Sequence, residues 1–252
     1  MSAGDAALSV RDLQVHRGEA HVLEGVSFEV RPRRVTALLG RNGAGKTTTL
    51  MTILGLLEGS GSIRLYGDEI LGVPTHHLVR RGIGYVPEDR EVFSTLTVAE
   101  NLRLAARTPE ATQRLDLVHE LFPDLLRRSA QRAGALSGGQ QQMVAIARAI
   151  LNPNRLLLID EPSKGLAPIV VGQVVEALAK AASATTILLV DQNIRVAQRL
   201  ATDAIVLDHG AVVFTGSMED LAADADLTQR YLGVAPSSRG SNTIGTEKGS
   251  AQ

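Results

Sequence analysis

The amino-acid sequence predicts an α/β protein built around a parallel core sheet. Short apolar runs at 156–159 and 187–190 have the length of strands and are apolar throughout, as strands buried on both faces are. These runs alternate with stretches of helical periodicity, an order that produces a right-handed parallel sheet. A glycine-rich segment at 40–47 stands between a predicted strand and a predicted helix.

The N-terminal half predicts an antiparallel β unit before the core. Residues 8–15 and 21–30 alternate in polarity and are expected to pair, with Arg17-Gly18-Glu19 as the turn. The next predicted elements are a core strand at 34–39, a helix at 47–57, a strand at 62–66 closed by a turn at Gly67-Asp68, a short helix at 76–81 and a core strand at 84–86.

The second half predicts a helical insert and then a return to alternation. Residues 97–132 are helical in pattern, and two helices are expected there, so that a helical subdomain covers about 90–150. The later elements are a helix from Gly138 to about Leu151, strands at 155–160, 185–190 and 204–207, helices at 168–182 and 194–201, a hairpin arm at 211–215 and two short helices to about Leu232. One domain is expected over 1–235, followed by a disordered tail at 236–252 that is rich in Ser, Gly and Thr.

The composition narrows the classes of function. The 252 residues carry a formal net charge of −1, which gives no bias toward nucleic acid or anionic lipid, so no nucleic-acid partner is expected. Without cysteine, disulfides, thiolate metal sites and cysteine nucleophiles are excluded. The first ten residues do not resemble a signal peptide, and no apolar run is long enough to cross a bilayer. A cytoplasmic protein that meets a membrane only through a partner is therefore expected.

The glycine-rich segment carries the most specific motif. Gly40-Arg41-Asn42-Gly43-Ala44-Gly45-Lys46-Thr47 fits G-x-x-x-x-G-K-[ST], the phosphate-binding P-loop. Its glycines let successive N–H groups face one anion at the positive end of a helix, Lys46 would reach the β- and γ-phosphates, and the Thr47 hydroxyl would bind Mg²⁺. The alternative is a glycine-rich turn with a surface lysine. The residues expected to bind nucleotide here are Gly40, Asn42, Gly43, Gly45, Lys46, Thr47 and Thr48.

Two further segments suggest chemistry. The strand at 156–159 ends in Asp160 and Glu161, whose adjacent carboxylates would repel each other without a cation or solvent. Asp160 suits holding Mg²⁺, and Glu161 suits orienting and activating a water; a helix-capping acid is the alternative. Ser137-Gly138-Gly139 precedes a helix and predicts a second anion site, with a plain N-cap serine as the alternative.

Together these motifs resemble the ATP-binding subunits of ABC transporters over roughly residues 8–232. In that family 40–47 would be the Walker A motif, 136–140 the signature and 156–161 the Walker B motif. The resemblance implies ATP and Mg²⁺ as cofactors. It also implies a head-to-tail dimer in which ATP lies between the Walker residues of one subunit and Ser137, Gly138 and Gly139 of the other. The helical insert would carry the docking groove for a membrane subunit, and 88–97, with Val92, Phe93 and Leu96, is expected to form it.

Segments 82–88, 163–171 and 190–193 resemble the branched-chain amino acid importer group in particular; urea and amide importers share the pattern. Three positions depart from the wider family: Glu88 replaces the Q-loop glutamine, Gln192 the switch histidine and Ala167 the D-loop aspartate. These three substitutions are interpreted as typical of the importer subgroup and not as a loss of function. Gln192 cannot become a cation and Glu88 brings charge near phosphate and Mg²⁺, so turnover is expected to be slower or to depend on the partner.

The resemblance implies roles for further residues. Glu161, Gln192 and Glu88 are the catalytic candidates, and Thr47, Asp160 and Glu88 are the candidates for the metal site. The aromatic residue that stacks on adenine in the family is absent, and Arg17 takes its place. A guanidinium plane can stack on a base, and a solvated turn arginine is the open alternative.

The resulting expectation is an ATPase that powers import of branched-chain amino acids or related solutes. Its implied partners are a second, non-identical ATPase subunit, transmembrane permease subunits and, indirectly, a periplasmic solute-binding protein. Its implied location is the cytoplasmic face of the inner membrane, where it is held by the permease. The alternatives are a urea or amide transporter ATPase, a lipopolysaccharide exporter ATPase, for which Gln at 88 and His at 192 would be expected, and an ABC ATPase outside transport, which usually shows a coiled-coil insertion or tandem domains.

Overall fold

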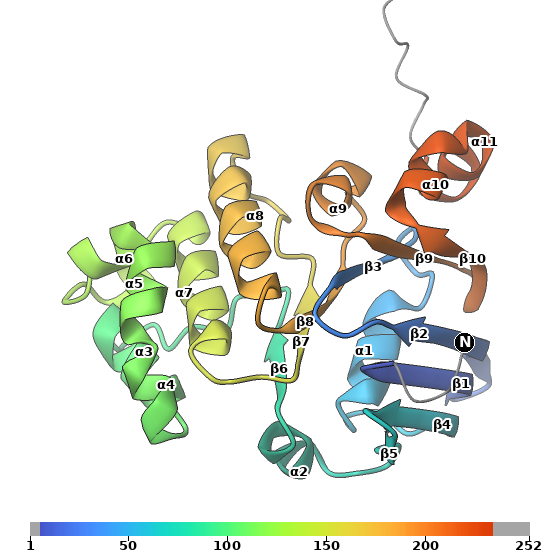
Figure 1. Cartoon of the computed structure of the whole chain (residues 1–252), viewed down its shortest axis with the longest axis horizontal. Coiled ribbons are helices and arrows are strands. Elements are labelled where there is room, and N and C mark those ends of the chain that lie inside the picture. Colours follow the sequence, from blue (N-terminus) through green and yellow to red (C-terminus); the bar gives the residue numbers. More distant parts are fainter. Residues whose placement is uncertain (1–5, 234–252) are drawn as a thin grey trace, which may run out of the picture.

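The computed structural model describes residues 6–233 and contains two sheets with helices around them (Figure 1). The expected tail at 236–252 lies outside the described residues. Mixed α/β architecture with an antiparallel N-terminal sheet and a mainly parallel core sheet confirms the predicted fold class.

The core sheet has six strands in the order β10-β9-β3-β8-β7-β6. All neighbouring pairs are parallel except β10 and β9, which form an antiparallel hairpin at one edge. The strands are β3 (Val35–Leu39), β6 (Ile83–Val86), β7 (Leu156–Asp160), β8 (Thr186–Val190), β9 (Asp203–Asp208) and β10 (Ala211–Ser217). The sheet thus brings the carboxyl ends of β3, β8, β7 and β6 to one edge.

The N-terminal sheet has the order β2-β1-β4-β5 and is antiparallel. Its strands are β1 (Leu8–Arg17), β2 (Ala20–Val30), β4 (Ser60–Leu65) and β5 (Asp68–Glu69). Strand β1 continues through Arg17, so the turn is shorter than expected and consists of Gly18 and Glu19. Helix α1 (Lys46–Ile53) ends four residues before the predicted end at Leu57, where the chain turns through Gly55 at φ 66°.

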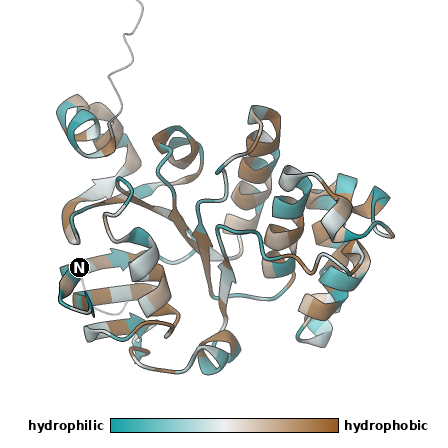
Figure 2. Ribbon diagram, turned by 180° about the vertical axis from the view of Figure 1, so that it is seen from behind, coloured by the Kyte–Doolittle hydropathy of each residue, from teal (hydrophilic) through white to brown (hydrophobic). Residues whose placement is uncertain are grey.

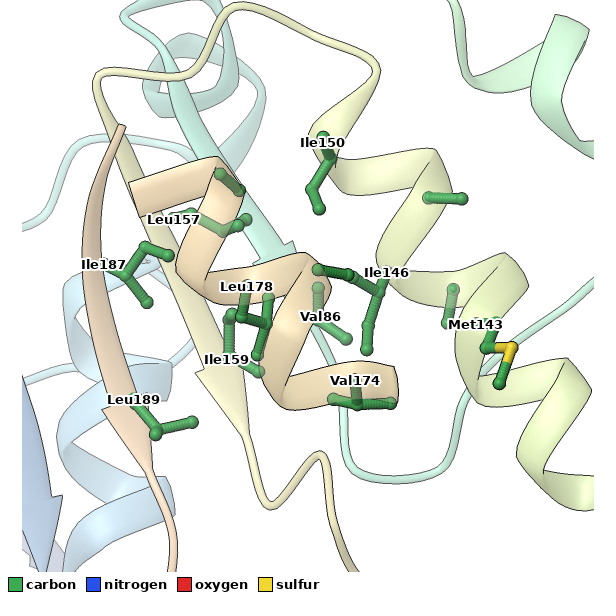
Figure 3. Close-up of a cluster of buried hydrophobic side chains, with 14 of the residues drawn as sticks. Val86, Met143, Ile146, Ile150, Leu157, Ile159, Val174, Leu178, Ile187 and Leu189 are labelled. Atoms are coloured by element: carbon green, nitrogen blue, oxygen red, sulfur yellow. The ribbon is translucent and has the colours of Figure 1, made fainter. Parts of the chain in front are cut away.

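Alternation along the core strands sends side chains into two separate apolar cores. Leu158 and Leu188 join α1 and the N-terminal sheet in one cluster. Leu157 and Ile187, one residue earlier on each strand, join the helices on the opposite face. Figure 3 shows this second cluster, with Leu178 of α8 and Ile146 of α7 lying over the sheet. Figure 2 shows hydrophobic residues concentrated on the central strands.

The helical insert contains more helices than expected. The segment predicted as two helices holds four, α3 (Val98–Ala105), α4 (Pro109–Gln113), α5 (Leu115–Leu121) and α6 (Pro123–Arg127). Pro109 and Pro123 each occupy a first helical position, where the missing N–H costs no hydrogen bond, so each proline starts a new helix. Phe122, between α5 and α6, is buried.

The remaining helices follow the core strands. They are α2 (Thr75–Arg80), α7 (Gly138–Ile150), α8 (Pro168–Ala182), α9 (Ile194–Leu200), α10 (Met218–Ala223) and α11 (Ala225–Leu227), with short turns η1 (Ala133–Ala135) and η2 (Thr228–Leu232). No helix within residues 6–233 is long and apolar enough to cross a membrane.

Candidate nucleotide site

A pocket of about 360 Å³ opens at the carboxyl edge of the core sheet, where α/β proteins bind ligands. Four adjacent strand ends supply its surroundings: β3 leads into the P-loop, β7 into Glu161, β6 toward Glu88 and β8 into Asp191. The pocket is lined by Arg17, Val22, Asn42, Gly43, Gly45, Lys46, Thr47, Thr48, Glu88, Glu161 and Lys164. The P-loop residues predicted from sequence, except Gly40, therefore share one pocket with Arg17, Glu88 and Glu161, whereas Asp160 does not line it.

The P-loop conformation requires glycine at two positions. At Gly40, a Cβ would lie 2.3 Å from the backbone oxygen of Leu207. At Gly45, which caps α1 at φ 106°, a Cβ would lie 2.5 Å from Leu23 of the N-terminal sheet. The contact at Gly40 is with backbone and leaves no room for a side chain, and the left-handed φ of Gly45 disfavours one, so the close packing of loop, β2 and β9 depends on these glycines.

Lys46 is folded back over its own loop. Its Nζ donates to the backbone oxygens of Gly40 at 2.9 Å and Arg41 at 3.1 Å, and only 5 % of the residue is exposed. Burial lowers the pKa of Lys46, against the pull of nearby carboxylates, first that of Glu161, whose Oε1 lies 3.8 Å from Nζ. The neighbouring Thr47 is exposed and lines the pocket.

The two carboxylates after β7 are buried and incompletely paired. Asp160 Oδ1 and Glu161 Oε2 have no hydrogen-bond partner, and both residues are at most 7 % exposed. Burial is the largest of the effects that raise the pKa of Asp160 to about 6, and the charges of Glu161 and Glu88 add to it. Glu161 is held in the left-handed region at φ 42°, with its N–H donated to Val190 O at 2.8 Å. Such strain is common at functional sites.

Two charged residues that the sequence analysis did not single out, Lys164 and Asp191, also lie at this edge of the core sheet. Lys164 forms an ion pair with Glu88, and its Nζ lies 3.6 Å from Glu161 Oε2. Asp191, at the end of β8, is buried, which raises its pKa; it accepts hydrogen bonds from the Ser163 hydroxyl at 2.9 Å and from the Asn193 N–H at 2.8 Å. A signal for Lys164 was its place three residues after Glu161, but Glu88 is 76 residues away from it.

The other predicted site residues lie elsewhere. Gln192 is exposed and does not line the pocket. Ser137, Gly138 and Gly139 begin α7, where the Ser137 hydroxyl accepts the Gln140 N–H at 3.3 Å in a reciprocal capping box. They do not line the P-loop pocket of the same chain, and Arg90 lies so close to Gly138 that a Cβ there would be 2.6 Å from its Nη1.

A P-loop and an acidic pair at the carboxyl edge of such a sheet define a nucleotide-phosphate-binding ATPase. A family model described as ABC transporter matches residues 23–164, and the chain belongs to this family. It is an ATP-binding subunit, a class of ATPase that works with transmembrane permease partners.

Curated relatives match nearly the whole chain. The high-affinity branched-chain amino acid transport ATP-binding protein BraG of Pseudomonas aeruginosa is 42 % identical over 90 % of this chain and 99 % of its own length. The probable branched-chain amino acid transport ATP-binding protein LivF of Archaeoglobus fulgidus is 35 % identical over 89 % and 99 %. The lipopolysaccharide export system ATP-binding protein LptB of Haemophilus influenzae is 34 % identical over 84 % and 91 %. A solved structure titled as an ATP-binding subunit of an ABC transporter has a TM-score of 0.77 and 32 % identity, covering 90 % of this chain and 96 % of that one.

Proposed function

We propose that this ATP-binding subunit powers the import of branched-chain amino acids or closely related solutes. The observation that carries the proposal is the 42 % identity to BraG over almost the full length of both chains. Lipopolysaccharide export is the second candidate, favoured by the 34 % identity to LptB. Glu88 and Gln192 argue against it, because glutamine and histidine are expected at these positions of an exporter ATPase. Urea or amide import is a further alternative, because the ATPases of such importers share the sequence pattern of segments 82–88, 163–171 and 190–193.

Residues of the pocket fit a magnesium nucleotide. Within residues 6–233 no three His, Cys, Asp or Glu side chains group into a metal site, so a cation here would need other oxygens as well. The Thr47 hydroxyl, the unpartnered Asp160 Oδ1 and phosphate oxygens of ATP would supply them. Mg²⁺ would neutralise charge that develops on the transferred phosphoryl group. Glu88, which is paired with Lys164, is the least free of the three proposed metal-site residues.

Each remaining residue then has a defined task in hydrolysis. Lys46 leaves its loop carbonyls for the β- and γ-phosphates, which offer anionic acceptors in place of two neutral carbonyl oxygens. Glu161 orients the attacking water and receives its proton at a carboxylate oxygen. Arg17 stacks on the base from the β1–β2 hairpin. Gln192 and Glu88 contribute by contact with the phosphate or water from the edge of the site.

The signature residues serve a second subunit. Ser137, Gly138 and Gly139 do not line the P-loop pocket of their own chain, which supports a head-to-tail pairing in which they meet ATP held by a partner. The partner is a second, non-identical ATPase. In this arrangement ATP is shared by Lys46 of one chain and an α7 N-terminus of the other, and hydrolysis removes the bridge.

The permease docks in a cavity of about 380 Å³ between the core and the helical subdomain at about 90–150. Leu56 after α1 and Leu104 on α3 line it while 55 % and 59 % exposed, and Pro87, Arg90 and Glu91 also line it. Val92, Phe93 and Leu96, the residues expected to form the groove, are not among its lining. The permease would hold the subunit at the cytoplasmic face of the inner membrane, opposite a periplasmic solute-binding protein.

Uptake in intact cells tests the proposal. Cells that lack this chain should lose most of their uptake of labelled leucine, isoleucine and valine, and the wild-type gene should restore it where Glu161→Gln does not. Normal uptake of these amino acids together with a defect in urea uptake or in surface lipopolysaccharide would identify one of the other transporters.

A further inference from the structure

Five charged side chains line the P-loop pocket, and the net charge of its lining depends on Lys164. The cations are Arg17, Lys46 and Lys164, and the anions are Glu88 and Glu161. Lys46 faces the phosphates from the P-loop itself. A nucleotide triphosphate carries several negative charges, so an uncompensated carboxylate at position 88 would repel it at the distances found within one pocket.

Lys164 contacts both carboxylates of the pocket. Its Nζ forms an ion pair with Glu88 Oε1 and lies 3.6 Å from Glu161 Oε2. Glu161 Oε2 is buried without a hydrogen-bond partner, so the ammonium of Lys164 is the charge that faces this oxygen. The other oxygen of Glu161, Oε1, faces Lys46. The carboxylate of Glu161 therefore lies between the ammonium groups of Lys46 and Lys164.

The fold makes this arrangement possible from distant parts of the chain. Lys164 stands in the turn after β7, where its N–H donates to Glu161 O at 3.1 Å. Glu88 follows β6, which pairs with β7 in parallel, so both segments leave the sheet at the same edge. Lys164 is 53 % exposed and Glu88 34 %, so the pair contributes little to stability, and its effect is to be sought in nucleotide binding.

We propose that Lys164 is a second lysine of the nucleotide site, which neutralises Glu88 and positions the carboxylate of Glu161. The inference rests on the proposal that ATP occupies this pocket. Glu88 and Lys164 together present the nucleotide with the net charge of a neutral side chain, which makes a carboxylate at position 88 compatible with the triphosphate. Lys164 acts through the two carboxylates and is therefore a positioning residue.

A double-mutant cycle between Lys164 and Glu88 tests the neutralisation. ATP affinity is measured by calorimetry on the full-length subunit and on Lys164→Met, Glu88→Gln and the double variant. Lys164→Met should raise Kd about tenfold, since one unscreened charge remains beside the phosphates. The double variant should return to within about twofold of wild type. Lys180→Met is the matched control, because Lys180 pairs with Glu176 on the surface of α8 and should leave Kd unchanged.

Turnover in the assembled transporter tests the positioning of Glu161. The kcat of the double variant should stay several-fold below that of Glu88→Gln alone, because restored binding does not return a cation to Glu161 Oε2. Lys164→Arg should retain both Kd and kcat. This split between Kd and kcat is not expected from a purely structural lysine.

Different results would contradict the neutralisation of Glu88, the positioning of Glu161 and the nucleotide site itself. A wild-type Kd for Lys164→Met, or a double variant that binds no better than Lys164→Met, would overturn the neutralisation of Glu88. A kcat of the double variant equal to that of Glu88→Gln alone would overturn the positioning of Glu161. If the wild-type subunit does not bind ATP, or if Lys46→Ala binds it equally well, the proposed nucleotide site itself is wrong.

Discussion

Individual residues of the site are arranged for a ligand and not for the stability of the empty protein. Asp160 and Glu161 keep unpartnered buried oxygens, and Glu161 also occupies a left-handed backbone conformation. Each of these features costs free energy of folding when no cation or nucleotide is present. The costs are informative, because they mark the positions where bound groups complete the site.

Replacement of Glu161 should separate binding from hydrolysis. Glu161→Gln keeps the size of the side chain but cannot take a proton from water, so ATP should bind while hydrolysis slows by about two orders of magnitude or more. The measurement is steady-state phosphate release by the purified complex, beside a direct ATP titration. Glu176→Gln on the exposed face of α8 is the control, and near-normal turnover of Glu161→Gln would contradict the assigned role.

Replacement of Asp160 should stabilise the nucleotide-free subunit. Its pKa rises from 3.8 to about 6 on folding, so between these values the folded state binds more protons than the unfolded state. The free energy of unfolding therefore falls as pH rises across this interval and stays lower above it. Asp160→Asn should remove this loss and be more stable at pH 7 by up to about 3 kcal/mol, the equivalent of about two pKa units.

Urea unfolding of both proteins at pH values on each side of the interval checks this prediction, without nucleotide or Mg²⁺. The two stabilities should converge toward the acid end, where Asp160 is protonated in both states. A constant difference at every pH would show that packing and not ionisation is responsible.

At the scale of elements, α3 and α7 connect the cavity proposed for permease docking to the residues proposed as the signature. Arg148 on α7 donates to Glu91 O at 2.6 Å, and its guanidinium lies 4.7 Å from the Phe93 ring centre. Asn101 on α3 bonds both backbone groups of Phe93, with the N–H donated to Oδ1 and the carbonyl accepting from Nδ2, each at 3.0 Å. The segment after Glu88 is thus bound on both sides by the helices that the permease would contact.

An acidic residue in the docking cavity should block assembly. Leu104→Asp places a charge on the exposed side chain that lines the cavity, so the fold is kept while burial against a permease becomes unfavourable. Co-purification with the permease should be lost. Leu126→Asp, at a 50 % exposed position on α6 outside the cavity lining, should assemble normally. Equal assembly of both variants would place the permease elsewhere.

At the scale of the whole molecule, the proposed function assigns to one chain two half-sites that face different partners. The P-loop pocket belongs to the core, and Ser137 belongs to the helical part of the chain, where it caps α7. A second subunit can therefore complete each site. Variants in the two half-sites should impair ATP sites on different subunits.

Photocrosslinking of ATP to each subunit of the transporter shows which subunit's ATP site a variant impairs. Lys46→Ala should reduce labelling of this chain by removing a charge-assisted contact with phosphate, whereas Ser137→Arg should spare it and disturb the partner's site. Transport should fall in both. Ser217→Arg removes a similar serine cap from α10 and controls for the lost cap alone. Loss of labelling on this chain with an intact partner site in Ser137→Arg would reject the trans arrangement.

Local patterns in the sequence determined much of the fold. Apolar runs of strand length predicted the core strands β7 and β8 almost to the residue, and the P-loop pattern identified residues that line one pocket, because strand burial and glycine conformation are local properties. The helical insert was predicted less well. Its apolar spacing did not reveal that Pro109 and Pro123 start separate helices, since a proline that breaks a helix and one that begins the next look alike without the packing.

Only the tertiary structure decided which charges meet. The order β3-β8-β7-β6 brings the P-loop, Glu88, Glu161 and Asp191 to one edge, although they are spread over most of the chain. The pairing of Lys164 with Glu88 follows from this order, and Ser137, which caps α7, does not line the P-loop pocket. Electrostatic interactions depend on distance in space and on burial, and sequence separation determines neither. The chemistry of each group could be predicted from its residue, and its neighbours could not.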